Sequence, residues 1–405
     1  MREKARSSSW ERIPKLTLLL GKTLLLAIAI AGLFALVLLF PFEQIRNWGW
    51  DIAVFRAGSN ALLHGQNPYD PANVLRFSDG AELASITNYV YAPFFAILIG
   101  PLSLLDPWLT SRAWFVINIA AYTAAIAAIM AALRWTPSLR AFTLIVLGLA
   151  IFPPFRTLLV IGQSGGIMLL LLALTFLLLS RGRQVSAGFA FGLAIFKPHL
   201  LLVPVFLTLR RQWKAVLAVL LTLLVTSIPF WSLLDDWAIS LINTRADNLG
   251  YGCLAFSSAM ALLQCFSESL LAQAMFTLSL IILSYWLIQD GTRPQTTLFA
   301  LQLCLVVSLS LLVIDNVRVA DLILLVLPFL VSLYALQSVE SHLVRRSAIG
   351  LLTAAYLFPY FAQVYGRLTG HPLLFEMPIW YAAVPAGMFS ATAVLLIERR
   401  YAMRE

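Results

Sequence analysis

The chain has 405 residues, of which 60% are hydrophobic and only 12% are charged, and its formal net charge is +9. This composition excludes an ordinary soluble enzyme, in which about a quarter of the residues are charged. Apolar runs of bilayer length recur from residue 16 to residue 397, and no polar block between them is long enough for a soluble domain. We therefore expect one all-α domain over residues 1–405, a polytopic membrane protein with about twelve transmembrane helices.

The sequence contains no signature of a bound metal or nucleotide. Its three cysteines, Cys253, Cys265 and Cys304, form no CxxC pair and have no histidine at ligand spacing. Glycine-rich phosphate-binding motifs are absent from the sequence, as is a soluble α/β domain to house one. We expect no metal and no cofactor. The positive charge is explained by membrane orientation and by anionic membrane lipids, so we expect no nucleic-acid partner.

The first apolar run covers residues 16–40 and follows a basic leader. It is long and ends without a small-residue cleavage pattern, so we interpret it as a retained first helix rather than a signal peptide. The positive-inside rule places the leader in the cytoplasm and residues 41–90 outside. That first external loop contains aromatic side chains suited to the membrane interface.

Asp51 lies just past the first span, in the aromatic sequence NWGWDIAVF. A carboxylate at this level is where a membrane enzyme could hold a general base against a lipid-borne substrate, and partial burial beside Trp48 and Trp50 would raise its pKa. The alternative interpretation is a solvated charge in an interfacial loop.

The next apolar segment, residues 91–112, is broken by three prolines and a glycine and is short for a crossing. We expect it to be re-entrant or interfacial. The two runs on either side of Lys197 are also far shorter than a crossing, and we interpret them as a broken or tilted hairpin. The predicted later spans, these two included, are 113–133, 141–155, 165–180, 186–196, 199–209, 214–231, 272–289, 297–314, 320–338, 348–365 and 378–398.

The distribution of charge supports this topology independently of hydropathy. On the predicted inner side lie 19 of the 28 Lys and Arg residues, whereas 13 of the 19 Asp and Glu residues lie outside. Both termini are then cytoplasmic. The polar segments that could carry chemistry, including residues 232–271, all fall on the outer side.

Lys197, in GLAIFKPHLLLVP, is a cation inside an otherwise apolar run. A charge at membrane depth costs roughly 2.5 to 3.5 kcal/mol, so it normally faces a cavity, a counter-charge or an anionic ligand. The alternative is that Lys197 snorkels toward the outer interface at a proline break. His199 either shares the same cavity or packs as an ordinary buried residue.

Other polar residues occur where helices break or begin. Arg156 and Gln163, in PPFRTLLVIGQSGG, lie where a helix stops and restarts, and the restart at Ser164 offers N–H groups to an anion. Asp315 and Asp321 bracket the outer end of one span, where Asp321 could simply complement a helix N-terminus. Further along the predicted outer face, polar side chains either bind sugar hydroxyls or line a loop; these are Asn248 and the pair Ser257 and Ser258.

In combination these segments resemble glycosyltransferase family 87, the DUF2029 group, within the GT-C superfamily. The pattern is an acid after the first span in W-x-D-I-x-V-F, then L-x-x-G-x-N-P-Y, Y-x-P-F, G-Q-S and G-x-A-x-x-x-K-P. It covers residues 47 to 205 well and the segments around Ser257 and Asp321 more loosely. The residues that carry it are Asp51, Phe55, Gly65, Asn67, Pro68, Tyr69, Tyr91, Pro93, Gly162, Gln163, Gly188, Lys197 and Pro198.

The resemblance implies a GT-C-like fold and an inverting membrane glycosyltransferase of the bacterial inner membrane. Such an enzyme moves a mannose-like hexose from a polyprenyl-phosphate sugar to a lipid or glycan acceptor at the extracytoplasmic face. The resemblance implies that Asp51 is the catalytic acid. The leaving phosphate gathers negative charge that a cation would stabilise, and we expect Lys197 to bind it, with Arg156 and Arg245 as second candidates. The residues expected to line the substrate are Tyr69, Asn67, Tyr91, Gln163, His199, Asn248, Ser258, Asp315 and Asp321.

This sequence departs from the family in one place: the stretch after Ser258 reads ALLQ, where family members often keep a basic residue. Two other classes of function remain open at this point. A lipid or polysaccharide transporter or flippase would also contain buried charge and broken helices, but it predicts charges spread through the membrane depth. A structural membrane subunit without activity would have no need of these polar segments.

Overall fold

The computed structural model describes residues 50–78, 89–250, 270–288, 296–314, 317–368 and 382–402. In these ranges every regular element is a helix, as the sequence predicted. The first predicted span, residues 16–40, and both chain ends lie outside them. The elements are α3 (Trp50–Leu63), α4 (Pro71–Arg76), α5 (Pro93–Ser103), α6 (Pro107–Leu133), α7 (Leu139–Ile151), α8 (Pro153–Ile161), α9 (Gly165–Ser180), α10 (Gln184–Ala194), η2 (Pro198–Leu200), α11 (Leu202–Leu209), α12 (Trp213–Ser227), η3 (Ile228–Leu233), α13 (Leu234–Gly250), α15 (Leu270–Ile288), α16 (Thr297–Val313), η5 (Val319–Leu325), α17 (Val326–Ala335), η6 (Leu336–Ser338), α18 (His342–Leu368) and α20 (Ala383–Ala402).

Three continuous helical stretches of the described chain are long and apolar enough to cross a bilayer. They are Pro107–Leu133, Trp213–Asn243 and Val319–Ser338. A fourth candidate is the pair α7 and α8, which bends by 47° between Ile151 and Pro153. Proline has no N–H to continue the helix and disfavours helical backbone in the residue before it, so the bend falls at this position. The described part of the chain is thus all-helical, with helices suited to a membrane protein, and the count of twelve spans stays a prediction.

The segment around Lys197 is broken as its length predicted. Helix α10 ends at Ala194, and Lys197 itself has an extended backbone, with φ −129° and ψ 118°. Pro198 then begins the single turn η2, which leads into the short helix α11. An extended residue between two short helices exposes backbone polar groups, which a protein tolerates at membrane depth only where other protein groups or a cavity surround it.

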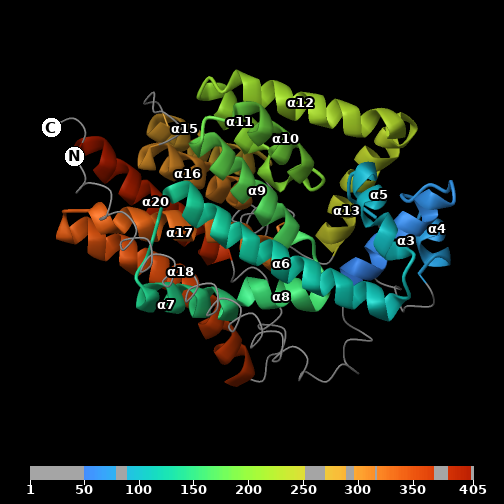
Figure 1. Cartoon of the computed structure of the whole chain (residues 1–405), viewed down its shortest axis with the longest axis horizontal. Helices are drawn as coiled ribbons and strands as arrows, with labels where there is room; N and C mark the ends of the chain where they lie inside the picture. Colours follow the sequence, from blue (N-terminus) through green and yellow to red (C-terminus); the bar gives the residue numbers. More distant parts are fainter. Residues whose placement is uncertain are drawn as a thin grey trace, which may run out of the picture.

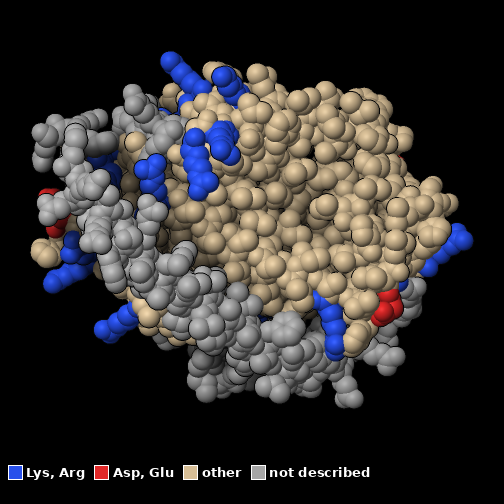
Figure 2. All heavy atoms as spheres, viewed as in Figure 1, with Lys and Arg blue, Asp and Glu red and all other residues tan. Residues whose placement is uncertain are grey.

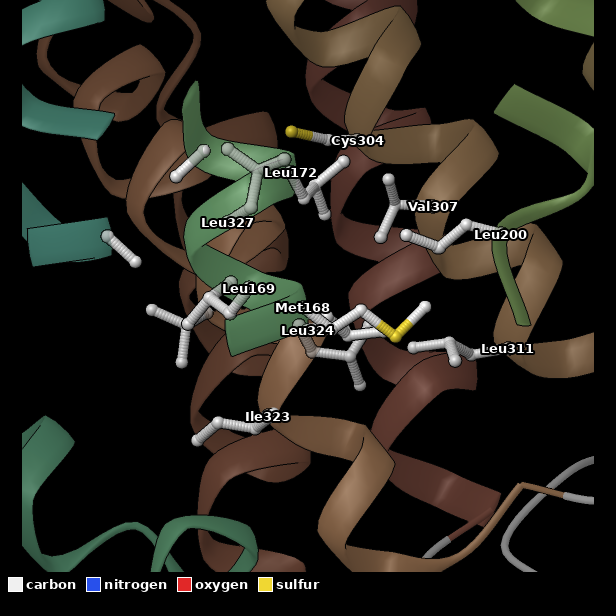
Figure 3. Close-up of a cluster of buried hydrophobic side chains, with 14 of the residues drawn as sticks. Met168, Leu169, Leu172, Leu200, Cys304, Val307, Leu311, Ile323, Leu324 and Leu327 are labelled. Atoms are coloured by element: carbon white, nitrogen blue, oxygen red, sulfur yellow. The ribbon is translucent and has the colours of Figure 1, made fainter. Parts of the chain in front are cut away.

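Helix α6 crosses the middle of the bundle and packs along α9 (Figure 1). On one side α10 packs against α12, and on the other α20 packs against α16 and α18. Between α9, α16 and η5–α17 lies a tight apolar core to which Met168, Leu172, Val307, Leu311 and Leu324 contribute (Figure 3). This core holds the start of η5 against α9.

A glycine makes that contact possible. A Cβ added to Gly165, at the first position of α9, would lie 2.9 Å from Ile323 Cγ2 and 3.2 Å from the Ala320 carbonyl oxygen. A larger residue would therefore push η5 away from α9. The glycine places the backbone around Asp321 directly beside the turn that precedes α9.

Helices α3, α4, α5 and α13 lie together at one end of the molecule (Figure 1). Hydrogen bonds join the two segments that were predicted to be external. Asn67 donates to Asp236 Oδ2 at 2.9 Å, and Ser240 and Trp237 donate to the carbonyl oxygens of Tyr89 and Val90 at 2.9 and 3.1 Å. These bonds tie α13 to the chain on both sides of residues 79–88.

Lys and Arg side chains gather mostly toward the opposite end, where α12 begins and α20 ends, beside a broad uncharged surface (Figure 2). We predict that this end is cytoplasmic and that Asp51, Asp70 and Asp247 face outside. A cysteine at position 70 should react with an impermeant maleimide added to intact cells, in a background whose three native cysteines are replaced by serine.

The matched control is Thr136→Cys, at an exposed position beyond the far end of α6. A helix of 27 residues spans about 40 Å, so positions 70 and 136 should lie on opposite faces of the membrane. Thr136→Cys should react only after the cells are opened. If position 70 is labelled only after the cells are opened, the predicted orientation is wrong.

Candidate functional site

Asp51 lies in the first turn of α3 and is 8% exposed. Its Oδ2 accepts a hydrogen bond of 2.7 Å from Gln163 Nε2. The interpretation of Asp51 as a solvated loop charge is therefore wrong, because helix α3 and its neighbours remove this carboxylate from solvent. The predicted burial of Asp51 beside two indole rings is not tested, because Trp48 and the side chain of Trp50 lie outside the described residues.

Gln163 occupies the turn between α8 and α9, and Gly162 shapes that turn. Gly162 ends α8 with φ 72° and ψ 33°, a conformation that favours glycine, and a Cβ there would lie 3.0 Å from Ile52 Cγ2. The Gly162 carbonyl accepts from Trp114 Nε1 at 2.8 Å, and the Gln163 N–H donates to the Leu158 carbonyl at 3.0 Å. The turn is thus fixed directly against the first turn of α3.

The other end of the Gln163 side chain faces a cation. Its Oε1 accepts from Tyr91 OH at 3.1 Å and from Lys197 Nζ at 3.3 Å. Lys197 also forms an ion pair with Asp321 Oδ1, and the Lys197 side chain is 12% exposed. The snorkelling interpretation of Lys197 is therefore wrong, since its ammonium group points into the protein toward two polar partners.

Asp321 is 1% exposed and uses both carboxylate oxygens. Oδ2 accepts from the Arg318 backbone N–H at 3.0 Å and lies 3.1 Å from His199 Nε2. The bond to Arg318 is the helix N-terminal role that the sequence suggested, and the bonds to Lys197 and His199 add to it. An ionised carboxylate only accepts, so His199 Nε2 carries the proton in this contact. Its Nδ1 is buried and has no hydrogen-bond partner among the described residues.

Asp51, Gln163, Lys197, Asp321 and His199 therefore form one buried polar network. Burial raises the pKa of Asp51, which lies in α3, outside the candidate membrane spans, while the charges of Arg318 and Lys197 and the bond from Gln163 oppose the rise. Sequence reasoning missed Arg318. The signal for it was a cation three residues before an acid at the start of an apolar run, in VRVADLILL.

An aromatic cluster packs beside this network and adds to its burial. The Phe55 ring meets the Tyr91 and Phe95 rings edge-on at 4.6 and 5.2 Å, and Phe95 stacks on Phe196 at 4.5 Å. Tyr69 adds an outer layer, because its hydroxyl donates to the Tyr91 carbonyl at 2.8 Å. Charges in such surroundings act more strongly on one another than they would in water.

Six of the predicted site residues meet here: the five of the network and Tyr91, whose hydroxyl donates to Gln163. Asn67 instead bonds to Asp236 and its own turn, and Arg156 is exposed on α8. The side chains of Arg245 and Asn248, and the whole of Ser258 and Asp315, lie outside what the structure describes. No group of three or more His, Cys, Asp or Glu side chains in the described chain is arranged to hold a metal ion.

The network contains a carboxylate that can take a proton and an ammonium group that can bind an anion. The carboxamide of Gln163 separates the two groups.

Comparison with protein-family models shows that the model of glycosyltransferase family 87 matches residues 89–314. No curated protein and no solved structure matches the chain. The matched range is more than half of the chain and contains Tyr91, Gln163, Lys197 and His199.

Proposed function

Because the chain belongs to glycosyltransferase family 87, we propose that it transfers a mannose-like hexose from a polyprenyl-phosphate sugar to a hydroxyl of a lipid or glycan, with inversion at the anomeric carbon. The observation that carries the proposal is the buried contact series from Asp51 through Gln163 to Lys197. Family membership supports a transferase over the transporter or flippase. The site faces the extracytoplasmic side in this proposal, and the membrane is the bacterial inner membrane.

In the proposed reaction Asp51 is the general base. The acceptor oxygen forms a bond to the anomeric carbon, the bond from that carbon to the phosphate oxygen breaks, and the acceptor proton passes to the carboxylate. Gln163 occupies Oδ2 of Asp51, so Oδ1 is the oxygen that receives the proton. A carboxylate with a raised pKa is a stronger base than a solvated one.

Lys197 binds the donor phosphate in this proposal. The electron pair of the broken bond leaves with the phosphate, whose negative charge grows in the transition state, and a fixed cation in surroundings poor in water stabilises it. A lysine ammonium has three N–H donors. Gln163 and Asp321 take two of them, which leaves the third for a phosphate oxygen. Inversion requires attack opposite the leaving group, so the sugar would lie beside the Gln163 carboxamide, between Oδ1 of Asp51 and the third donor of Lys197.

The pH dependence of transfer tests this assignment. Because burial raises the pKa of Asp51 above its ordinary value of 3.8, the base should be lost as the pH falls through that raised pKa. We expect kcat/KM to fall tenfold per pH unit below it and to be constant above it until a second group titrates. The measurement uses purified protein in detergent, a synthetic polyprenyl-phosphate mannose and a lipid acceptor.

The control donor is a mannose nucleotide without the lipid phosphate, which should give no product. Turnover of that nucleotide in place of the lipid donor would contradict the proposed donor class. A flat rate profile across the acidic range, in a preparation that transfers mannose, would instead contradict the base assignment.

A further inference from the structure

Gln163 is the described side chain that touches both the proposed base and the proposed phosphate-binding cation. We infer that Gln163 is a positioning residue, whose carboxamide holds the Asp51 carboxylate and the Lys197 ammonium apart at a fixed separation and keeps them from pairing directly. The inference rests on the proposed transfer reaction and adds a role for a residue that the sequence suggested only as part of the substrate lining.

The orientation of the carboxamide is determined by its neighbours. Lys197 has donors and no acceptor, so the atom that faces it must be the amide oxygen. An ionised Asp51 only accepts, so the atom that faces it must be the amide nitrogen. Tyr91 OH supplies a second donor to the oxygen at 3.1 Å. Rotation of the amide by 180° would break these contacts, so the Gln163 carboxamide has only one orientation that satisfies its neighbours.

The side chain is not required to build the turn that carries it. That turn is already secured by backbone groups, since Trp114 bonds to the Gly162 carbonyl and the Gln163 N–H bonds to the Leu158 carbonyl. Gly162 fixes the backbone conformation. The carboxamide oxygen adds one long bond to the turn, which it accepts from the Ser164 backbone N–H at 3.4 Å. Its shorter contacts are with Asp51, Tyr91 and Lys197.

The charges explain why a neutral spacer is useful here. Asp51 and Lys197 have opposite charges in surroundings poor in water, where a direct ion pair would be strong. Such a pair would occupy the carboxylate oxygen needed for the acceptor proton and the ammonium donor needed for the phosphate. A neutral amide between them satisfies one oxygen of Asp51 and one donor of Lys197, and leaves the second oxygen and another donor for the substrates.

Two substitutions of similar size test the inference. Gln163→Glu keeps an oxygen toward Lys197 but places a like charge against Asp51, which raises the proton affinity of the pair. Gln163→Met keeps the volume and removes the hydrogen bond that lowers the pKa of Asp51. The fall of kcat/KM at low pH, its acidic limb, should therefore begin at a higher pH in both variants. The shift should be about 1 pH unit or more in Gln163→Glu. Gln163→Glu should also raise the KM of the donor, because its charge repels the phosphate.

The matched control is Gln212→Glu, at another buried glutamine, which is 7% exposed and lies beyond the end of α11. Its acidic limb should coincide with that of the parent. Thermal unfolding in detergent reports folding for every variant. If both Gln163 variants lose rate equally at all pH values and their acidic limbs coincide with that of the parent, the inference is wrong and Gln163 is a packing residue.

The outcomes separate this inference from the proposed function. If the parent protein transfers no sugar from the lipid donor, the proposed function fails whatever the Gln163 variants do. A different result would contradict only the role of Gln163. In that case the parent is active, Asp51→Asn is inactive, and the Gln163 variants have the same acidic limb as the parent.

Discussion

Asp51→Asn should lose about 10²- to 10⁴-fold in kcat, the usual contribution of a general base, while the KM of the donor changes little. The reason is geometric as well as chemical. An asparagine still offers an oxygen to the Gln163 amide, so the first turn of α3 and the contact of 2.7 Å are preserved. Only the ability to accept the acceptor proton is removed. Initial rates with a synthetic polyprenyl-phosphate mannose measure the effect.

Asp236→Asn is the matched control for this experiment. Asp236 also lies in the first turn of a helix and accepts from a carboxamide, that of Asn67 at 2.9 Å, but it belongs to the contacts that join α13 to residues 67–90. It should keep its rate within a few-fold of the parent. An Asp51→Asn protein that works equally well would show that Asp51 is not the base and direct attention to Asp321 or Asp315.

Lys197→Met should lose at least about 10²-fold in kcat, comparable with the removal of one donor to a developing anion. It should also be less stable. The substitution leaves Asp321 buried at 1% exposure without its cation, and loss of one partner of a buried ion pair costs about 3–5 kcal/mol. A loss of activity in Lys197→Met alone would therefore mix two effects, chemistry and folding.

The double variant Lys197→Met/Asp321→Asn separates them. With a neutral amide opposite a neutral side chain, most of the lost stability should return in thermal unfolding, since no uncompensated charge remains. Transfer should stay lost, because no cation meets the phosphate. Lys214→Met, at an exposed position in the first turn of α12, is the control and should match the parent in both measurements. A double variant that folds and turns over at the parent rate would remove Lys197 from the mechanism.

Hydropathy was enough to predict the helices whose apolar runs are long and uninterrupted. The predicted spans 165–180 and 297–314 correspond to α9 and α16 almost residue for residue. Pro198 and the short length of the two flanking runs also predicted the break at Lys197. Prediction was weakest for the number of crossings, because several apolar helices are too short to span a bilayer alone and length cannot tell a tilted span from a re-entrant piece.

The candidate site was predicted residue by residue but not as pairs. Asp51, Gln163 and Lys197 each attracted attention through an unusual local setting. The ion pair of Lys197 with Asp321 joins positions 124 apart in sequence, and no local pattern encodes which buried acid meets which buried cation. Asp321 was assigned a helix N-terminal role because that role depends on three neighbouring residues alone. The long-range role depends on how η5 packs against α9, which the sequence pattern does not specify.

The separation of Lys197 and Asp321 along the chain has a consequence for how the protein is made. A ribosome that has just finished the Lys197 turn must add another 124 residues before the counter-ion exists. At about 5–20 residues per second this interval lasts roughly 6 to 25 seconds. During this interval the Lys197 ammonium group lacks its carboxylate partner, and an unpaired charge at membrane depth is costly. We therefore expect the segment α10–η2–α11 to reach its final depth only after η5 emerges, and the candidate site to be among the last parts of the molecule to assemble.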